Sequence, residues 1–374
     1  MSSIFIPPPE PKSALGYLRM LSPTAAVRVS PLCLGAMNFG DEWKEILGEC
    51  SQETSNDILD YFYDRGGNFI DTANNYQHGQ SEKWVGEWMK QRGVRDEMVI
   101  STKYTTAFGG YLGKNKGIIA NTGGNGAKSL HLSLARSLEN LQTDYIDLLY
   151  IHWWDFTTSI PELMHALNDV IAAGKVLYIG VSDTPAWIVA KANQYARDHG
   201  LRQFCVYQGR WSAAMRDFER DIIPMVQHEN MSFMPWGTMG GGTFKTEEQR
   251  KVSEGRGKDE NSPNVVAVTQ ALEKIAKEKN TLITSVALAY VMQKVPYVFP
   301  IVGGRKVDHI KGNIEALSLE LTKEEVAEIE GATPFDIGFP LNLITKSAQD
   351  SFLNKYAGHI KYVEVSKPIP PHKK

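Results

Sequence analysis

Four side chains in the first half of the chain have the types needed to move a proton to or from a substrate oxygen. Each lies at the end of a short apolar run or a few residues beyond it: Asp71, Tyr76, Lys103 and His152. Because an ammonium favours a neighbouring phenolate, we expect Lys103, held by Asp71, to lower the pKa of Tyr76. His152 could donate a hydrogen bond to the same oxygen and polarise a carbonyl group. These groups together predict general acid-base catalysis at a carbonyl or alcohol oxygen.

Each of these residues also has a structural explanation when taken alone. A Tyr after a strand commonly packs, and an Asp before Thr72 commonly forms a turn. A His before Trp153 and Trp154 can be a core residue with a satisfied ring. The chemical interpretation is favoured because all four residues fall at, or just past, the predicted ends of consecutive strands.

The elements that would position these side chains are predicted by short apolar runs that alternate with amphipathic helical stretches. Helical patterns such as 81–93 and 159–173 lie between the runs and end at Gly93 and Gly174. The alternation predicts a (β/α)8 TIM barrel, in which the carboxyl ends of the strands face the active site. No G-x-G-x-x-G follows the first strand, which argues against a Rossmann sheet. Strands are expected at 32–37, 68–73, 98–104, 145–152, 176–182, 204–208, 231–236 and 298–304.

A single barrel domain is expected to span residues 1–374, because no break in composition divides the chain. Its core covers about 18–332, after a Pro-rich N-terminal arm at 1–13. A C-terminal extension at 333–374 follows a helix expected at 322–331, and its apolar residues predict that it packs on the barrel as far as Tyr362.

Three segments outside the repeating pattern are expected to close or cover the barrel. A hairpin around Ser22 and Pro23 is predicted to plug one end. The stretches 109–126 and 237–263 are Gly-rich or charged and longer than ordinary connections, which predicts functional loops that act as lids.

Composition and charge exclude several classes of function. Hydrophobic residues at 42% and a net charge of -3 are ordinary for a globular protein and indicate neither a nucleic-acid nor a membrane partner. Three scattered cysteines indicate no disulfide framework, and no cluster has metal-ligand spacing, so no metal is expected. The N-terminus lacks the apolar segment of a signal peptide. A cytoplasmic protein that is a monomer or a weak homo-oligomer is therefore expected.

Several motifs, taken together, resemble those of a known superfamily. In order and spacing, D-T-A-N-N-Y (71–76), S-T-K-Y (101–104), Y-I-H-W-W (150–154) and G-V-S-D (180–183) resemble the aldo-keto reductases, over about 18–332. The resemblance implies that Asp71, Tyr76, Lys103 and His152 form the catalytic tetrad of that family. The phrases L-G-A-M-N-F-G-D-E-W and P-W-G-T-M-G-G-G further resemble the fungal aryl-alcohol dehydrogenase branch, which implies aryl aldehyde or alcohol substrates.

The same resemblance implies NADP(H) as the cofactor and a set of residues around it. Ser182, Asp183 and Gln208 would hold the carboxamide. The loop after the seventh strand reads F-M-P-W-G-T-M-G-G-G where the family has Y-S-P-L-x-x-G, so Phe233 and Trp236 are both candidates to stack on the nicotinamide. The full implied set is Ala36, Met37, Asp71, Ser182, Asp183, Gln208, Phe233, Met234, Trp236, Gly237, Gly303, Arg305, His309, Gly312 and Asn313.

Arg305 and Lys306 favour NADP over NAD, because a guanidinium makes charge-assisted contacts with a 2′-phosphate that a ribose hydroxyl cannot match. The alternative is that the two cations only solvate the start of a helix. Arg256, in the long loop, is a second candidate for the phosphate.

Aromatic residues near the predicted mouth indicate an apolar slot for a flat ring beside Tyr76 and His152. The candidates are Trp153, Trp154, Tyr111 and Phe108, with core packing as the alternative for at least one of them.

The expected function is therefore NADPH-dependent interconversion of aryl aldehydes and aryl alcohols, with Tyr76 as general acid and base. Two alternatives stay open from sequence: a reductase of a polyketide or other secondary-metabolite ketone, and a nucleotide-binding regulatory subunit like the channel β-subunits. The first shares the chemistry and differs only in the pocket, whereas slow turnover would distinguish the second.

Overall fold

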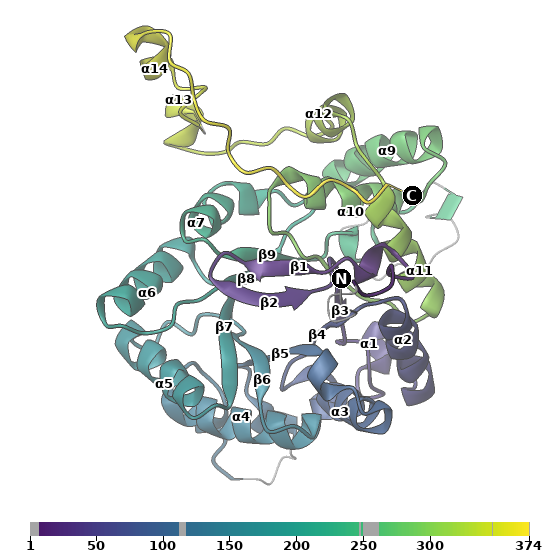
Figure 1. Ribbon diagram of the computed structural model, residues 1–374, viewed down its shortest axis with the longest axis vertical. Coiled ribbons are helices and arrows are strands. Elements are labelled where there is room, and N and C mark those ends of the chain that lie inside the picture. Colours follow the sequence, from purple (N-terminus) through teal and green to yellow (C-terminus); the bar gives the residue numbers. More distant parts are fainter. Residues whose placement is uncertain (1–6, 112–116, 247, 250–261, 346, 374) are drawn as a thin grey trace, which may run out of the picture.

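The centre of the computed structural model is a sheet of eight parallel strands surrounded by helices (Figure 1). The structure describes residues 7–111, 117–246, 248–249, 262–345 and 347–373. The strand order is β10-β3-β4-β5-β6-β7-β8-β9, and a parallel bridge between Phe233 and Val298 brings β9 back to the segment before β10. The sheet is thus a nearly closed barrel, which confirms the predicted fold. The strands are β3 (Cys33–Gly35), β4 (Phe69–Asp71), β5 (Val99–Tyr104), β6 (Ile146–Ile151), β7 (Val176–Ser182), β8 (Val206–Arg210), β9 (Ser232–Trp236) and β10 (Ile301–Val302).

The helices cover the outside of the barrel, and their ends carry the expected capping residues. In α5 the Ser159 hydroxyl accepts from the Glu162 N–H, and Leu163 and Leu167 are buried. Helix α3 ends at Gly93, whose φ of 67° suits glycine. The helices of the barrel are α1 (Lys44–Leu47), α2 (Gln52–Asp64), α3 (Gln80–Arg92), α4 (Ala127–Leu141), α5 (Ile160–Ala172), α6 (Ala186–Asp198), α7 (Ile222–His228), α9 (Pro263–Glu278), α10 (Ile283–Lys294), α11 (Val307–Glu315) and α12 (Lys323–Gly331). Within the described residues, no helix is both long and apolar enough to cross a membrane.

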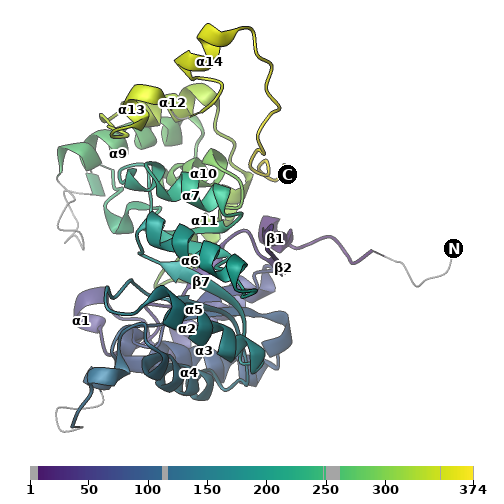
Figure 2. The ribbon, with the colours of Figure 1, turned by 90° about the vertical axis from the view of Figure 1, so that its left-hand side faces the viewer.

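The hairpin of β1 (Arg19–Ser22) and β2 (Ala25–Val29) closes the amino-terminal end of the barrel. Leu21 and Val29 pack in one buried cluster with Cys33, Phe69 and Leu148 of the barrel strands. Figure 2 shows the hairpin on the side of the molecule opposite to α1. Because the amino-terminal half is filled in this way, only the carboxyl ends of the strands are free to form a site.

The C-terminal extension departs from expectation. Its helices α13 (Leu341–Ile344) and α14 (Phe352–Ala357) contain no buried residue, and Figure 1 shows them projecting beyond α12. The prediction that the extension packs on the barrel as far as Tyr362 is therefore wrong for this middle portion. Its apolar residues suggested burial, but the sequence does not specify the surface that would bury them.

Candidate active site

The ammonium of Lys103 lies at the centre of the candidate site, buried between β4 and β5. Its Nζ is 2.5 Å from Asp71 Oδ2, 2.7 Å from the Thr72 carbonyl oxygen and 3.3 Å from the Tyr76 hydroxyl oxygen. The parallel register of Asp71 against Ser101 brings the two strand ends together. These three acceptors match the three N–H donors of an ammonium, so Lys103 has one fixed position.

The other oxygen of Asp71 is held equally firmly. Asp71 Oδ1 accepts from the Ser101 hydroxyl at 2.8 Å and from Gln208 Nε2 at 3.0 Å, across the barrel from β8. Both side chains are buried. Gln208 was expected as a cofactor residue, and here it also orients the carboxylate. Ser101 was not singled out from the sequence, although it opens the S-T-K-Y motif.

Burial raises the pKa of Tyr76, and Lys103 offsets only part of this effect. The expectation of a lowered pKa is therefore wrong, because removing a phenol from water disfavours the phenolate more than one ammonium favours it. Burial lowers the pKa of Lys103, but Asp71 and Tyr76 more than reverse this, so its pKa is raised. At neutral pH the site thus holds a protonated phenol against a charged ammonium.

His152 follows β6 and lies edge-on to Tyr76, with 5.8 Å between the ring centroids. Burial and the charge of Lys103 hold the pKa of His152 well below its usual value, so the ring is neutral. His152 Nδ1 is 3.2 Å from the Thr106 hydroxyl, and Trp153 Nε1 donates to that same hydroxyl at 3.0 Å. If the hydroxyl gives its single proton to Nδ1, the ring hydrogen is on Nε2. Thr106 was not found from the sequence.

A reciprocal pair of hydrogen bonds joins the loops that follow β5 and β6. The Asn125 N–H donates to Asp155 Oδ2 at 2.7 Å, and the Asp155 N–H donates to Asn125 Oδ1 at 2.8 Å. Asn125 Nδ2 donates to Thr105 Oγ1 at 2.8 Å and to the Trp153 carbonyl oxygen at 3.0 Å. We call this pair the Asn125–Asp155 clip. It holds Trp153, which follows His152, and Thr105, whose hydroxyl accepts from the His152 N–H at 3.2 Å. The clip too was missed from the sequence.

Ser182 and Asp183, predicted to hold the carboxamide, end β7 next to Gln208. The Ser182 hydroxyl lies 3.4 Å from Asp183 Oδ2, and the Asp183 N–H donates to the Gln208 carbonyl oxygen. Burial raises the pKa of Asp183 to about 6, against opposing hydrogen bonds from Ser182 and Trp236. Ala36, which is buried, and Met37, which is 41% exposed, follow β3. These residues share the barrel end that carries Asp71 and Lys103.

The two candidate aromatic residues of β9 point in different directions. Phe233 is 1% exposed and packs near Trp211 and Phe218, outside the barrel. Met234 lies inside the barrel, in register with Gln208, and accepts from the Tyr150 hydroxyl. Trp236, at the strand end, is 37% exposed. The side chain of Phe233 therefore packs away from the barrel interior and does not support its expected stacking on the nicotinamide, whereas the cofactor role of Met234 stays a prediction. The alternation of side chains along a strand explains the difference.

The segment predicted to bind adenosine forms the turn into α11. The Arg305 guanidinium packs so closely against Gly48 that a Cβ atom at residue 48 would clash with it. The Arg305 backbone N–H donates to His309 Nδ1 at 3.3 Å. Gly303 comes before this turn, and Gly312 packs close to Leu282. The glycine at 312 is therefore explained by helix packing.

Two buried polar atoms in these regions have no hydrogen-bond partner among the described residues. They are Nδ2 of Asn313, on α11, and Oγ1 of Thr238, which follows the left-handed Gly237. Buried polar atoms are normally hydrogen-bonded, so these two fit a site whose partners come from a bound nucleotide. Arg256 lies outside the described residues.

The predicted substrate residues are not all placed together. Trp153 is 43% exposed and stacks on His152 at 3.9 Å, whereas Trp154 packs against the main core. Phe108 is buried beneath Arg136, and the side chain of Tyr111 lies outside the described part of the chain. Core packing thus accounts for Trp154, which is the alternative that the sequence left open for at least one of these residues.

Of two further aromatic residues that the sequence did not single out, one lies beside a catalytic side chain and the other is exposed on a loop. Trp43 is edge-on to Tyr76 with 6.3 Å between centroids, and Phe156 is 77% exposed on the loop after β6. Trp43 ends the L-G-A-M-N-F-G-D-E-W phrase. Phe156 has no sequence signal, because its exposure becomes apparent only in the folded loop.

Comparison with known proteins agrees with this geometry. The profile of the aldo/keto reductase family matches residues 31–333. Norsolorinic acid reductase B from Dothistroma septosporum is 59% identical over 372 residues, which cover 95% of this chain and 94% of that protein. Aryl-alcohol dehydrogenase [NADP(+)] from Phanerodontia chrysosporium is 45% identical over 392 residues, covering 99% and 100%. Norsolorinic acid reductase A from Aspergillus parasiticus is 56% identical over 344 residues, covering 92% and 88%.

The chain belongs to the aldo/keto reductase family. It is therefore an oxidoreductase of a family that uses NADP(H), and its resemblance to the fungal aryl-alcohol dehydrogenase branch is confirmed.

Proposed function

We propose that this protein reduces the carbonyl group of an aryl aldehyde or ketone with NADPH, and oxidises the corresponding alcohol in reverse. The observation that carries the proposal is the placement of Lys103 between Asp71 and Tyr76, next to a neutral His152. This grouping lies at the open end of the barrel. It supplies one proton donor and one further hydrogen-bond donor to a single oxygen atom.

The cofactor would lie across the carboxyl ends of the strands. Ser182, Asp183 and Gln208 would hold the carboxamide, with Trp236 as the aromatic surface for the ring. Arg305 and Lys306 would bind the 2′-phosphate at the amino end of α11, where the helix dipole also favours an anion. Asn313, with its unpartnered Nδ2, would contact the adenine. When bound, NADPH supplies the hydride to the carbonyl carbon.

The protein residues would manage the charge that develops on the substrate oxygen. Tyr76 would donate its proton to that oxygen, and Lys103 would stabilise the tyrosinate that forms. His152 would donate from Nε2 and so polarise the carbonyl group before the transfer. In alcohol oxidation the tyrosinate takes the proton back.

An aromatic substrate is favoured by the residues around Tyr76. Trp43 and the His152–Trp153 stack flank the phenol. A second candidate is a ketone of the kind named for the norsolorinic acid reductases, which are among the similar proteins. It shares the reaction and differs in the size of the molecule that the aromatic residues must accept.

The test is the loss of NADPH absorbance with matched panels of benzaldehydes, short alkanals and norsolorinic acid. Higher kcat/KM for substituted benzaldehydes would support the first candidate, and higher kcat/KM for norsolorinic acid would support the second. Preference for short alkanals would contradict an aryl site. Tight NADPH binding without turnover on any carbonyl would instead indicate the regulatory alternative.

A further inference from the structure

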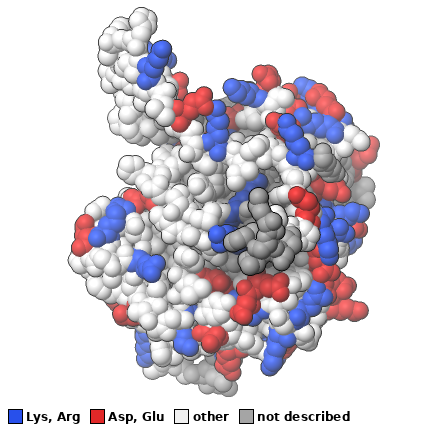
Figure 3. Space-filling model, viewed as in Figure 1, with Lys and Arg blue, Asp and Glu red and all other residues white. Residues whose placement is uncertain are grey.

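The face of the barrel opposite to the candidate site carries charges of both signs. Figure 3 is seen from the hairpin side, which Figure 2 shows opposite to α1, and its Lys and Arg side chains lie among Asp and Glu side chains. A charged partner is attracted by a surface of one opposite sign, and this face presents a mixture.

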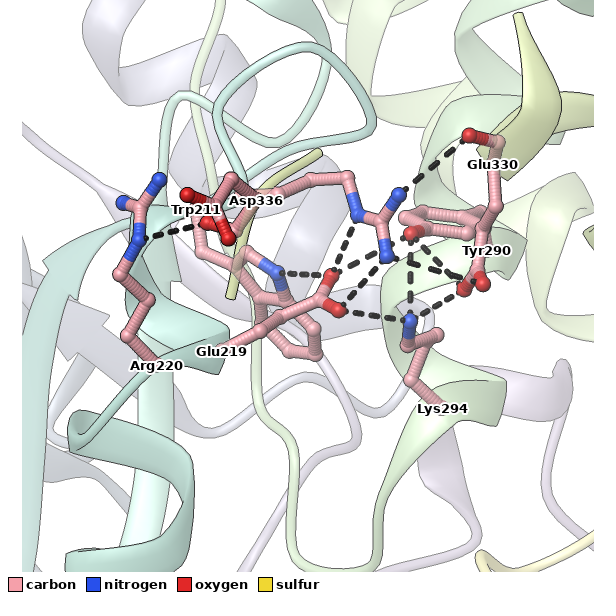
Figure 4. A network of polar contacts seen from close by, with 8 residues as sticks. Trp211, Glu219, Arg220, Tyr290, Lys294, Glu330 and Asp336 are labelled. Atoms are coloured by element: carbon pink, nitrogen blue, oxygen red, sulfur yellow. Dashed lines mark hydrogen bonds and ion pairs between the residues drawn. The ribbon is translucent and has the colours of Figure 1, made fainter. Parts of the chain in front are cut away.

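The cluster of charges in Figure 4 is balanced within itself. Two cations each contact the same two carboxylates, and the four residues are Arg216, Lys294, Glu219 and Glu330. These contacts join α10 and α12 to the segment before α7. The cluster therefore serves the packing of these elements, and the polar groups that bear on the substrate are at the carboxyl end of the barrel.

Three side chains that follow Tyr76 each hold one of three successive residues in the loop after β3. The contacts run in opposite directions along the two segments. They are the Asp41 N–H to Gln80 Oε1 at 2.8 Å, Glu42 Oε2 with His78 Nδ1 at 3.1 Å, and the Trp43 N–H to Gln77 Oε1 at 2.7 Å. The loop that carries Trp43 is thus fixed to the segment that carries Tyr76.

Gln77 is the buried member of this set. Its side chain is 0% exposed, and its Nε2 also donates to the Met37 carbonyl oxygen at 3.1 Å. One amide group therefore holds both ends of the stretch from Met37 to Trp43. The His78–Glu42 pair is 41% and 47% exposed, and exposed ion pairs contribute little to stability. Gln77 is thus the main fastening of the loop.

The backbone at Gln77 and His78 is strained. Their φ angles are 50° and 53°, in the left-handed region that residues other than glycine rarely adopt. Such strain persists where the surrounding structure enforces it, and it clusters at functional sites. Here Gly40 packs so closely on Gln77 that a Cβ atom at residue 40 would clash with it. The strained segment is therefore held in place by the loop after β3.

Trp43 is the residue of this loop that reaches the catalytic phenol. Its ring lies edge-on to Tyr76, with 6.3 Å between centroids and 69° between planes. His152, stacked on Trp153, also adjoins Tyr76. A carbonyl group that reaches the Tyr76 hydroxyl brings its substituent next to these rings, and aromatic rings attract one another edge to face. The position of Trp43 thus bears on which substituent is preferred.

We propose that Gln77 is a positioning residue, which holds Trp43 beside Tyr76 and so determines the preference for aryl over alkyl carbonyls. Gln77 acts through the backbone N–H of Trp43 and does not touch the substrate. The inference rests on the proposed function, because it concerns the aryl substrate of that reaction.

The first test compares kcat/KM for a substituted benzaldehyde and for a short alkanal in wild type and Gln77→Met. Methionine is unbranched and flexible, so it can fill the space of Gln77 without its amide. We expect the ratio of aryl to alkyl kcat/KM to fall about fivefold, the scale of one lost hydrogen bond. The loss should appear in KM for the benzaldehyde, and kcat for the alkanal should stay as in wild type.

A double variant tests whether the effect passes through Trp43. Trp43→Ala should lower the same ratio, and adding Gln77→Met should lower it no further, because both changes act on one ring. Gln52→Met is the matched control, since Gln52 Nε2 donates to Glu87 Oε2 at 2.6 Å between α2 and α3. The control should keep the wild-type ratio.

A second measurement does not depend on turnover. The chain has eight Trp residues, and in protein labelled with fluorotryptophan the fluorine NMR signal of Trp43 is the one that Trp43→Phe removes. Gln77→Met should shift or broaden this signal and leave the others in place, which also shows that the fold is kept. Gln77→Gly removes the side chain and suits the left-handed backbone, so it replaces Gln77→Met if that variant does not fold.

Two results would overturn the inference while the proposed function stands: an aryl preference that Gln77→Met and Gln77→Gly leave unchanged, or losses that add in the double variant. A wild type that prefers short alkanals would refute the proposed function instead. In that case a Trp43 signal that moves in Gln77→Met still supports the positioning role of Gln77, and a signal that does not move overturns it.

Discussion

Lys103 Nζ lies 2.5 Å from Asp71 Oδ2 and 3.3 Å from the Tyr76 hydroxyl oxygen. The carboxylate thus holds the ammonium, and the ammonium acts on the phenol. Burial raises the pKa of Tyr76 and Lys103 opposes that rise. The geometry therefore assigns opposite pH dependences to the two directions of the reaction.

The first prediction concerns this pH dependence. Carbonyl reduction needs the protonated phenol, so its kcat/KM should be constant at neutral pH and fall as pH rises through the pKa of Tyr76. Alcohol oxidation needs the phenolate and should rise over the same range. Because Lys103 lowers the pKa of Tyr76, Lys103→Met should move both transitions to higher pH. Profiles of kcat/KM in the two directions check this, and an unmoved transition in the variant would assign it to another group.

The second prediction concerns cofactor selectivity. Arg305→Ala removes a guanidinium that offers charge-assisted hydrogen bonds to a 2′-phosphate. The preference for NADPH over NADH should fall by roughly 10- to 100-fold, as expected for 1.5–3 kcal/mol of such bonding. Fluorescence titration with both nucleotides measures it. Lys311→Ala, on the exposed side of the same helix, is the control. Equal loss of affinity for NADPH and NADH would mean that Arg305 contacts a group present in both nucleotides and not the 2′-phosphate.

The third prediction concerns the Asn125–Asp155 clip and acid stability. Partial burial raises the pKa of Asp155, but hydrogen bonds from the backbone of Asn125, Thr158 and Thr157 outweigh this and bring the pKa to about 2. A depressed carboxyl pKa adds stability that is present above the unfolded value of about 3.9 and is lost as pH falls toward 2. Asp155→Asn should therefore destabilise the protein at neutral pH, with a smaller difference from wild type toward pH 2. Urea unfolding between neutral pH and pH 2 measures the difference in unfolding free energy between the variant and wild type. This difference would stay constant with pH if ionisation of Asp155 did not contribute to stability.

The fourth prediction tests the role of Thr106 in holding His152. Thr106→Val keeps the shape but removes the hydroxyl that contacts Nδ1, so the imidazole can adopt either tautomer. We expect kcat to fall by about fivefold, the scale of one hydrogen bond of about 1 kcal/mol, with KM for NADPH unchanged. Thr106→Ser should restore kcat. Nitrogen NMR of the labelled histidine reports the tautomer directly, and a wild-type ring protonated on Nδ1 would refute this role.

The parts of the site that the sequence predicts are those tied to strand ends and to motifs. Asp71, Lys103 and His152 fall where the apolar runs stop, so a barrel places them at one end. The choice between Phe233 and Trp236 was not predictable, because β9 is apolar on both faces and its alternation has no sequence marker. Thr106, Asn125 and Asp155 act through loop contacts between residues distant in sequence. The C-terminal extension was misplaced because its apolar residues suggested burial, whereas the sequence does not specify a surface that would bury them.

The last prediction is that Tyr76 supplies the proton. Tyr76→Phe removes only the hydroxyl, so the fold and the Kd for NADPH should stay as in wild type. The kcat for carbonyl reduction should fall by roughly 10² to 10⁴, the usual scale of general acid catalysis. Lys103→Met should also lower kcat, since it leaves the donor in place but removes the charge that stabilises the tyrosinate. The two losses should be far from additive in the double variant, because both act on one proton transfer.

Steady-state kinetics with a substituted benzaldehyde measures all three variants, and NADPH binding by fluorescence is the control for folding. If Tyr76→Phe kept more than about a third of the wild-type kcat, the proton would come from another group, and His152, with its ring centroid 5.8 Å from that of Tyr76, would be the next residue to replace.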